Sequence, residues 1–305
     1  MLSAIALAAL IQSAPVSEDI FILSEPAPLH GTLLTPADTR AAAVLIPGSG
    51  PTDRNGNQLP AVQAATLRLL AEALAEDGIA TVRIDKRGVG ASAMAAFSED
   101  RLRFDHMAED ARSWAADLAT RTGQQCVWLM GHSEGGLVAQ VAAADNPQVC
   151  GVILLASAGR PAADVVREQL AALPQPTHDQ AMHALSELEA GRTVEPVPGL
   201  EALFRPSVQP YIISWFRHDP GALAAAYDRP IMIVHATHDI QVGAADADAL
   251  SAAQPNAERL DLEGVNHVLK ASPADRAGNI AVYGDPDAPL AEGLADAVAA
   301  FVLEN

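Results

Sequence analysis

The 305-residue chain is predicted to fold as an α/β protein, with a doubly wound, mostly parallel sheet and helices on both faces. Short apolar runs that do not alternate with polar residues recur along the chain, as is typical of strands buried on both faces of a sheet. Helical patterns separate these runs, so strand and helix alternate. The alternation lapses only over residues 160–229, which predicts a helical cap inserted between core strands.

Composition limits the function classes. Half of the residues are hydrophobic (50%), so the chain can bury a large core. The 19 Lys and Arg residues stand against 38 Asp and Glu, which gives a net charge of −19. Such a surface repels polyanions, and we therefore expect no nucleic-acid partner. Composition leaves the oligomeric state open.

The N-terminus carries an apolar run, residues 2–11, which is too short to span a bilayer. It resembles the central region of a signal peptide, and we predict a signal over residues 1–14 and export to the periplasm or medium. No Lys or Arg precedes the run, so the alternative is an N-terminal helix on a cytoplasmic protein. No other run approaches the length of a membrane span.

In the first half of the chain, prolines divide residues 21–23 from 29–34, which predicts an antiparallel pair at the sheet edge. Residues 41–46 form a buried strand that ends in Pro47-Gly-Ser-Gly-Pro51. A helix over 61–76, a strand over 79–84 and an amphipathic helix capped at or just before Asp105 follow.

In the second half, strands are predicted at 126–130, 151–156, 230–236 and 259–262, with a closing helix at 290–302. The cap region contains predicted helices at 162–173 and 179–189, separated by prolines. It also carries five of the twelve aromatic residues: Phe204, Tyr211, Trp215, Phe216 and Tyr227. This cluster either forms the core of the cap or lines an apolar acyl pocket, and the sequence does not separate these alternatives.

Ser133 is the candidate nucleophile. It stands at the centre of Gly131-His-Ser-Glu-Gly135, between a buried strand and a helix. A strand–turn–helix of this kind forces the serine into a strained backbone conformation and presents it at the helix N-terminus, with glycines where side chains would collide. The alternative without a catalytic role is a Ser-Gly turn at the start of an ordinary helix.

A serine nucleophile needs a base that a carboxylate orients. Functional groups in a doubly wound sheet lie at the carboxyl ends of strands. Asp239 and His267 each follow a strand, and the order Ser133, Asp239, His267 is that of α/β-hydrolases. Asp85 also follows a strand, but the adjacent Lys86-Arg87 favours an ion pair that fixes its loop.

The other histidines fit less well. His132 neighbours the nucleophile, so its side chain should point away from the cleft. His235 and His238 are three residues apart, but no third metal ligand is obvious, and we predict neither metal nor cofactor. The remaining histidines fall at the sheet edge, on a helix or in the cap: His30, His106, His178, His183 and His218.

Five motifs in this order resemble the serine α/β-hydrolases, in their capped esterase and serine-aminopeptidase-like branch: residues 47–54, 85–92, 131–135, 237–242 and 264–267. The resemblance implies the α/β-hydrolase fold, with a core of residues 15–159 and 230–305 and a cap of 160–229. It also implies Ser133 as nucleophile, His267 as base and Asp239 as its orienting acid.

This resemblance extends to the oxyanion hole, where the usual His-Gly is Pro47-Gly48 here. It implies the backbone N–H groups of Ser49 and Glu134 as donors, with Gly50 as the second choice or as a substrate contact. Tyr211 and Trp215, four residues apart, are the cap residues expected to touch substrate.

These expectations favour hydrolysis of carboxylic esters with small to medium acyl groups. A peptidase or thioesterase could use the same triad, and a non-catalytic binding module is the third reading. The expected partner is a small acyl substrate. Cys126 and Cys150 each open a strand beside the Ser133 segment, so they could form a disulfide in an exported protein, or remain two small buried thiols in the cytosol.

Overall fold

The computed structural model describes residues 14–96 and 98–305, so the predicted signal segment lies outside the described residues except for Ala14. Eight strands form one sheet in the order β1-β2-β4-β3-β5-β6-β7-β8. β1 and β2 pair antiparallel at one edge and the others run parallel, as predicted. The strands are β1 (Val16–Ile22), β2 (Leu29–Thr35), β3 (Ala41–Ile46), β4 (Ile79–Ile84), β5 (Val127–His132), β6 (Val149–Leu155), β7 (Ile231–Ala236) and β8 (Glu258–Leu262).

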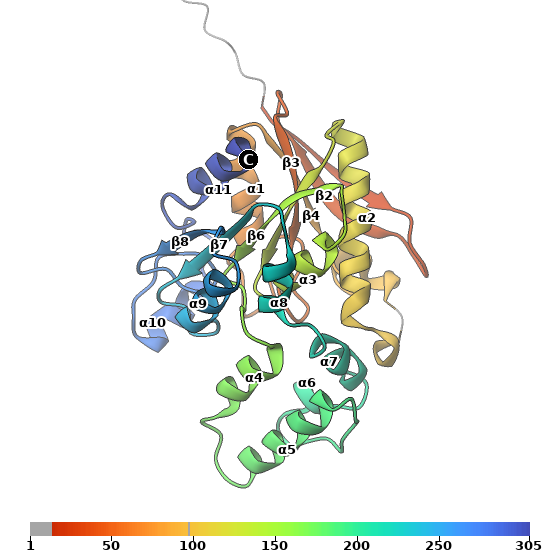
Figure 1. The fold of residues 1–305 in the computed structure, drawn as a ribbon, viewed down its shortest axis with the longest axis vertical. Helices are drawn as coiled ribbons and strands as arrows, with labels where there is room; N and C mark the ends of the chain where they lie inside the picture. Colours follow the sequence, from red (N-terminus) through yellow and green to blue (C-terminus); the bar gives the residue numbers. More distant parts are fainter. Residues whose placement is uncertain (1–13, 97) are drawn as a thin grey trace, which may run out of the picture.

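Helices cover both faces of the sheet (Figure 1). On one face lie α1 (Thr66–Glu76) and α11 (Leu294–Glu304), and on the other α2 (Phe104–Thr122), α3 (Glu134–Ala143), α8 (Pro220–Ala226) and α9 (Ala244–Ala253). Successive strand residues serve opposite layers: Val44 packs with α2 and α3, whereas Leu45 packs with α1 and α11. The uninterrupted apolar runs follow from this burial on two sides.

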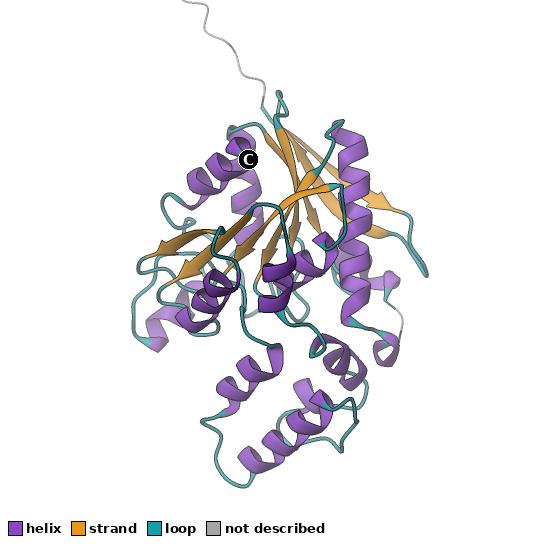
Figure 2. Cartoon of the chain, viewed as in Figure 1, coloured by secondary structure: helices purple, strands orange, loops and turns teal. Residues whose placement is uncertain are grey.

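The insertion between β6 and β7 is entirely helical and lies at one end of the molecule (Figure 2). It contains α4 (Ala162–Leu170), α5 (Thr177–Glu189), α6 (Glu201–Phe204) and α7 (Gln209–Trp215), which share their own apolar core around Leu185, Leu188 and Phe204. α8, which ends the insertion, packs against α3 and α9 of the sheet layer instead.

Some element boundaries differ from prediction. α1 begins at Thr66, not near residue 61, because Gln58 and Val62 form a short β-bridge and Ala65 adopts a left-handed conformation, φ 51°. α9 and α10 (Arg276–Tyr283) were not predicted; α9 mixes alanine with acidic residues and lacks a clear apolar stripe. Two short 3₁₀ segments, Gly90–Ala95 and Glu99–Arg101, complete the fold.

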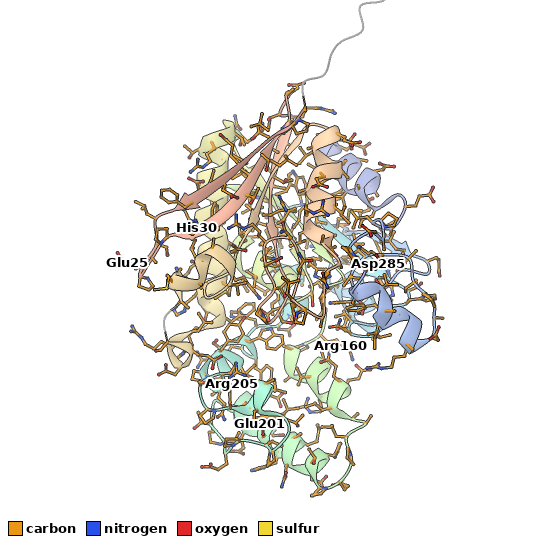
Figure 3. The ribbon with its side chains drawn as sticks, turned by 180° about the vertical axis from the view of Figure 1, so that it is seen from behind. Glu25, His30, Arg160, Glu201, Arg205 and Asp285 are labelled. Carbon is orange, nitrogen blue, oxygen red and sulfur yellow. A yellow bond between two sulfur atoms is a disulfide. The ribbon has the colours of Figure 1, made fainter. Side chains whose placement is uncertain are left out.

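Side-chain bonds anchor the inserted region to the sheet domain. Arg160, labelled at the junction in Figure 3, bonds both carboxylate oxygens of the fully buried Asp246 at 3.1 and 2.8 Å. Cys126 and Cys150 form a disulfide between the starts of β5 and β6, with a Cα separation of 5.2 Å. No helix among the described residues is both long and apolar enough to cross a membrane.

Candidate active site

Ser133 occupies the turn between β5 and α3 in a strained backbone conformation, φ 55° and ψ −124°. Its N–H donates to the Leu155 carbonyl of β6 at 2.9 Å, and its own carbonyl accepts the Ser157 hydroxyl at 2.9 Å. A non-glycine residue keeps such a conformation only where its surroundings enforce it, and strain of this kind gathers at functional sites. The strand–turn–helix geometry predicted for Ser133 is therefore present.

The flanking glycines are required by close backbone packing. A Cβ on Gly131 would lie 2.0 Å from the Gly135 carbonyl oxygen, and one on Gly135 would lie 2.4 Å from the Ile46 carbonyl oxygen. Gly136 faces Ser157, whose hydroxyl would be 2.1 Å from an added Cβ. The sequence pattern did not indicate Ser157, which lies 24 residues after Ser133 in the chain.

Asp239 and His267 come from the loops after β7 and β8 and meet at this edge of the sheet. The His267 Nδ1–H donates to Asp239 Oδ2 at 2.6 Å. The other Asp239 oxygen accepts the backbone N–H groups of Gln241 and Val242, at 2.7 and 2.9 Å. The Asp239 side chain is fully buried, so this carboxylate is held rigidly and fixes the tautomer and orientation of the imidazole.

His132 contacts His267 through a hydrogen bond and through its ring, and the sequence did not predict this contact. Its Nε2 bonds the His267 carbonyl oxygen at 2.8 Å, and the two rings lie 4.8 Å apart. Burial, followed by the nearby His267, lowers the pKa of His132 to about 4. The ring is therefore neutral at pH 7 and donates through Nε2–H, because a carbonyl oxygen can only accept.

Ser133 and His267 share no hydrogen bond within the described residues. They are linked indirectly, because His132 precedes Ser133 in the chain and bonds the His267 carbonyl.

The loop after β3 lies directly against the nucleophile, since a Cβ on Gly48 would be 3.1 Å from the Ser133 Cβ. Ser49 of this loop and Glu134, the first residue of α3, line a cavity of about 120 Å³ together with Ser133. Within the described residues neither the Ser49 nor the Glu134 backbone N–H donates a hydrogen bond. The Glu134 N–H, at the N-terminus of α3, suits a developing negative charge, and the Ser49 N–H is a donor without a partner in the described part of the chain, in the loop that lies against Ser133.

A second cavity, of about 680 Å³, adjoins the first under the cap. Ser49, Glu134 and Trp215 line both cavities, whereas Gly50 and Tyr211 line only the larger one. The Tyr211 hydroxyl donates to Glu134 Oε1 at 2.7 Å, and burial raises the pKa of this phenol well above its usual range. Tyr211 and Trp215 also pack on the cap core. These two aromatic side chains therefore both contribute to the core of the cap and line a cavity, the two alternatives that the sequence left open.

Asp85 does not pair with Lys86 or Arg87. It accepts three bonds from Arg54, through the backbone N–H, Nε and Nη2, and one from the Ala91 N–H. Arg87 instead binds Asp110 with two bonds of 2.7 Å. The predicted loop-fixing role of Asp85 is present, but with a different partner that comes from the loop after β3.

His238 bonds the Ser272 carbonyl at 2.9 Å through Nδ1, and His235 is buried in β7. In residues 14–96 and 98–305 no three His, Cys, Asp or Glu side chains are arranged to hold a metal ion.

Comparison with protein families gives a match over residues 63–265 to the model described as serine aminopeptidase, S33. No curated protein sequence matches the chain. Solved structures share the fold at low identity. The α/β hydrolase GrgF from Penicillium sp. sh18 is 20% identical, with 83% of this chain and 91% of that chain covered and a TM-score of 0.58.

Two further similar structures carry different names, one as Est1E with ferulic acid bound and one as a proline iminopeptidase. Est1E from Butyrivibrio proteoclasticus, solved with ferulic acid bound, is 16% identical (93% and 96% covered, TM-score 0.58). A proline iminopeptidase from Mycobacterium smegmatis is 14% identical (94% and 98% covered, TM-score 0.60). With its mostly parallel eight-stranded sheet and a family match over more than half its length, the chain is a hydrolase of the α/β-hydrolase superfamily and belongs to the serine aminopeptidase S33 family.

Proposed function

We propose that this protein is a serine hydrolase that cleaves carboxylic esters of small to medium acyl groups, with Ser133 as nucleophile, His267 as base and Asp239 as the acid that orients it. The observation that carries the proposal is the strained Ser133 at a cavity wall, preceded in the chain by His132, which bonds the carbonyl of His267. The Nδ1–H of His267 is in turn held at 2.6 Å by a buried carboxylate. An ordinary helix-opening serine requires neither feature.

In the proposed reaction, His267 Nε2 takes the Ser133 proton as Oγ attacks the ester carbonyl. The Ser49 and Glu134 N–H groups stabilise the oxyanion of the tetrahedral intermediate. The intermediate collapses as His267 returns the proton to the departing alcohol, and Ser133 keeps the acyl group. Water, activated by the same imidazole, then releases the acid. An imidazolium forms once during acylation of Ser133 and once during hydrolysis of the acyl-enzyme. The negative charge of Asp239 therefore lowers the barrier of both steps.

The carboxylates that line the cavities bear on whether the substrate is an ester or the free N-terminus of a peptide. An aminopeptidase must hold a free ammonium, which calls for an unpaired carboxylate near the nucleophile. The carboxylates that line the two cavities are Glu134 and Glu99. Glu99 is paired with Arg205 and also accepts the Ser207 hydroxyl, whereas within the described residues Glu134 accepts only the neutral Tyr211 hydroxyl and forms no salt bridge. Glu134 is therefore the carboxylate at which a peptide ammonium would bind if the protein were an aminopeptidase. The ferulic acid in Est1E is consistent with acyl groups of this size in the fold.

Two assays test the proposal. A fluorophosphonate probe should label Ser133, and Ser133→Ala should abolish the label; an unlabelled wild-type protein would support a binding module. A panel of nitrophenyl esters of graded chain length should be hydrolysed much faster than an aminoacyl anilide or an acyl thioester. Preferential cleavage of the anilide would replace the ester assignment with a peptidase one.

We also propose that the protein is exported. The Cys126–Cys150 disulfide supports this location, since such bonds persist in oxidising compartments. Cell fractionation should recover a chain shortened by about 14 residues outside the cytoplasm. A full-length chain in the cytosol, with both thiols free, would refute this proposal.

A further inference from the structure

Lys86 is a cation at the active site that the proposed reaction does not use. It follows β4 directly and lines the larger cavity. Its Nζ donates to the carbonyl oxygen of Gly48 in the loop that lies against Ser133. No carboxylate lies within salt-bridge distance of it among the described residues. Burial lowers the pKa of Lys86, and the charge of Glu134 offsets part of this effect. Keeping an ammonium half-buried without a paired anion is costly, so its position calls for a reason.

The bond to Gly48 controls the direction of the next N–H. The three cis peptide bonds of the described residues lie elsewhere, each before a proline, so the Gly48–Ser49 peptide is trans. In a trans peptide the C=O and N–H point in opposite directions. An ammonium that holds the Gly48 carbonyl therefore aims the Ser49 N–H away from itself.

The next peptide of the loop is held by different side chains. The Ser49 carbonyl accepts the Gln58 amide at 2.8 Å and the Thr52 hydroxyl at 2.7 Å. These bonds orient the N–H of Gly50. Lys86 and Gln58 thus act on separate candidate donors, Ser49 and Gly50, and substituting each side chain tests one donor alone.

Glu134 links this arrangement to the cap. Its backbone N–H is the second proposed donor, its carboxylate attracts Lys86, and its Oε1 accepts the Tyr211 hydroxyl of α7. The Glu134 carboxylate therefore attracts Lys86 at longer range and is hydrogen-bonded to a cap helix.

We propose that Lys86 is a positioning residue for catalysis: its ammonium holds the Gly48 carbonyl so that the Ser49 N–H is aimed at the oxyanion. The inference rests on the proposed function, because it acts through the oxyanion of an acyl group on Ser133. It requires a positive charge at this position, and a side chain of the right length alone does not suffice.

The chain allows a direct test, because its two cysteines are bonded to each other. Lys86→Cys introduces a single free thiol. Alkylation with 2-bromoethylamine restores an ammonium at nearly the length of lysine, and propyl methanethiosulfonate adds an uncharged chain of similar size. Mass spectrometry verifies each modification, and thermal unfolding verifies that each protein is folded.

We expect Lys86→Cys to lower kcat for an acetyl ester by about 10- to 100-fold with KM nearly unchanged, somewhat less than the loss of a whole oxyanion donor. Aminoethylation should recover most of the activity, and the propyl chain should recover none. The Ki of an alkylboronic acid, whose tetrahedral adduct places an oxygen in the hole, should rise by the same factor as kcat falls.

Gln58→Met is the matched control for the neighbouring peptide and should reduce kcat less than Lys86→Met does. The reverse order would make the Gly50 N–H the donor and overturn the inference. Near-wild-type kcat in folded Lys86→Cys, or equal recovery with the propyl chain, would also overturn it. If Lys86→Cys does not fold, Glu134→Gln replaces it; this variant keeps the backbone donor, and boronate affinity should fall in parallel with kcat.

Failure of the proposed function has a different signature. Wild-type protein would then cleave none of the esters, whatever the state of residue 86. The rate of fluorophosphonate labelling at Ser133 would still report the ammonium, since the phosphonyl oxygen uses the same donors. If neither modification of the introduced thiol changed the rate of labelling, the role of Lys86 would be refuted independently of the substrate.

Discussion

The turn around Ser133 and the helical cap above it are held in place in different ways. Backbone packing fixes the turn: Gly131 and Gly135 touch neighbouring main chain so closely that no Cβ fits. The cap has its own apolar core and joins the sheet domain through separate side-chain bonds, such as the Phe104 N–H donating to the Ser214 hydroxyl oxygen at 2.8 Å.

This contrast suggests a division of roles. The groups of the proposed triad, whose chemistry would need positions fixed to within a fraction of an ångström, lie at the edge of the sheet. Residues that would set the fit of the acyl group lie on helices that pack around a separate apolar core. Substitutions at the turn should therefore abolish activity or folding, whereas those in the cap should change selectivity.

The largest effect is expected at the proposed triad. Ser133→Ala, His267→Ala and Asp239→Asn should each reduce kcat by on the order of 10³-fold or more, without additivity, because the three groups act as one unit. Steady-state kinetics on a short nitrophenyl ester measures this. Turnover near wild type in Asp239→Asn, with loss in Asp85→Asn, would move the acid to Asp85.

Gly131→Ala should come next. The new methyl carbon would lie 2.0 Å from the Gly135 carbonyl oxygen and 2.4 Å from the Gly136 nitrogen, so the main chain must move. We expect a loss of about 2–4 kcal/mol in the free energy of unfolding, measured by urea denaturation. Gly243→Ala is the control, because nothing lies within 4 Å of its Cβ position. Equal effects at both glycines would contradict the packing argument.

His132 should make stability depend on pH. Its pKa is lowered to about 4 in the folded chain, against an ordinary value of 6.5, so between these values the unfolded chain binds the extra proton. The contribution of the neutral ring is therefore complete above pH 6.5 and is lost as pH falls toward 4, by roughly 3 kcal/mol at most.

The difference in unfolding free energy between wild type and His132→Gln, followed by urea denaturation from pH 7 to pH 4, isolates this contribution. Other groups, such as Asp110, whose pKa burial raises to about 6, cancel in the difference. A difference that stays constant with pH would show that His132 is protonated as easily when folded as when unfolded.

The smallest effect is expected in the cap. Trp215 lines both cavities, so Trp215→Ala should remove the gain of about 0.8 kcal/mol per buried CH₂ and flatten the chain-length profile. Hydrolysis of an acetyl ester should change little. Phe216, adjacent in sequence but absent from both cavity walls, provides the control variant Phe216→Ala. An equal loss across all esters would mean that Trp215 only supports the cap core.

Local patterns were sufficient to predict most elements. β3 and β4 have the predicted bounds, and the antiparallel pair at the edge forms as the prolines indicated. The predicted start of α1 was wrong because hydrogen bonds of the preceding loop, including the Ala65 N–H donating to Asn57 Oδ1, outweigh helix propensity. α9 has no amphipathic signal, since its environment and not its sequence pattern selects the helix.

The sequence by itself determined the parts of this protein that depend on neighbours along the chain. A buried strand followed by Gly-His-Ser-Glu-Gly leaves few backbone solutions, and the order of the strand-end motifs indicates the candidate nucleophile, acid and base.

Only the tertiary structure decided contacts between residues far apart in the chain. Among these contacts are the hydrogen bonds of His132 with the His267 carbonyl, of Lys86 with the Gly48 carbonyl, of Tyr211 with Glu134 and of Arg54 with Asp85. Sequence spacing cannot predict such pairs, because a charged or hydroxyl group finds its partner through the packing of the sheet and cap. Local periodicity records burial and turn geometry, and it carries no information about which distant atoms meet.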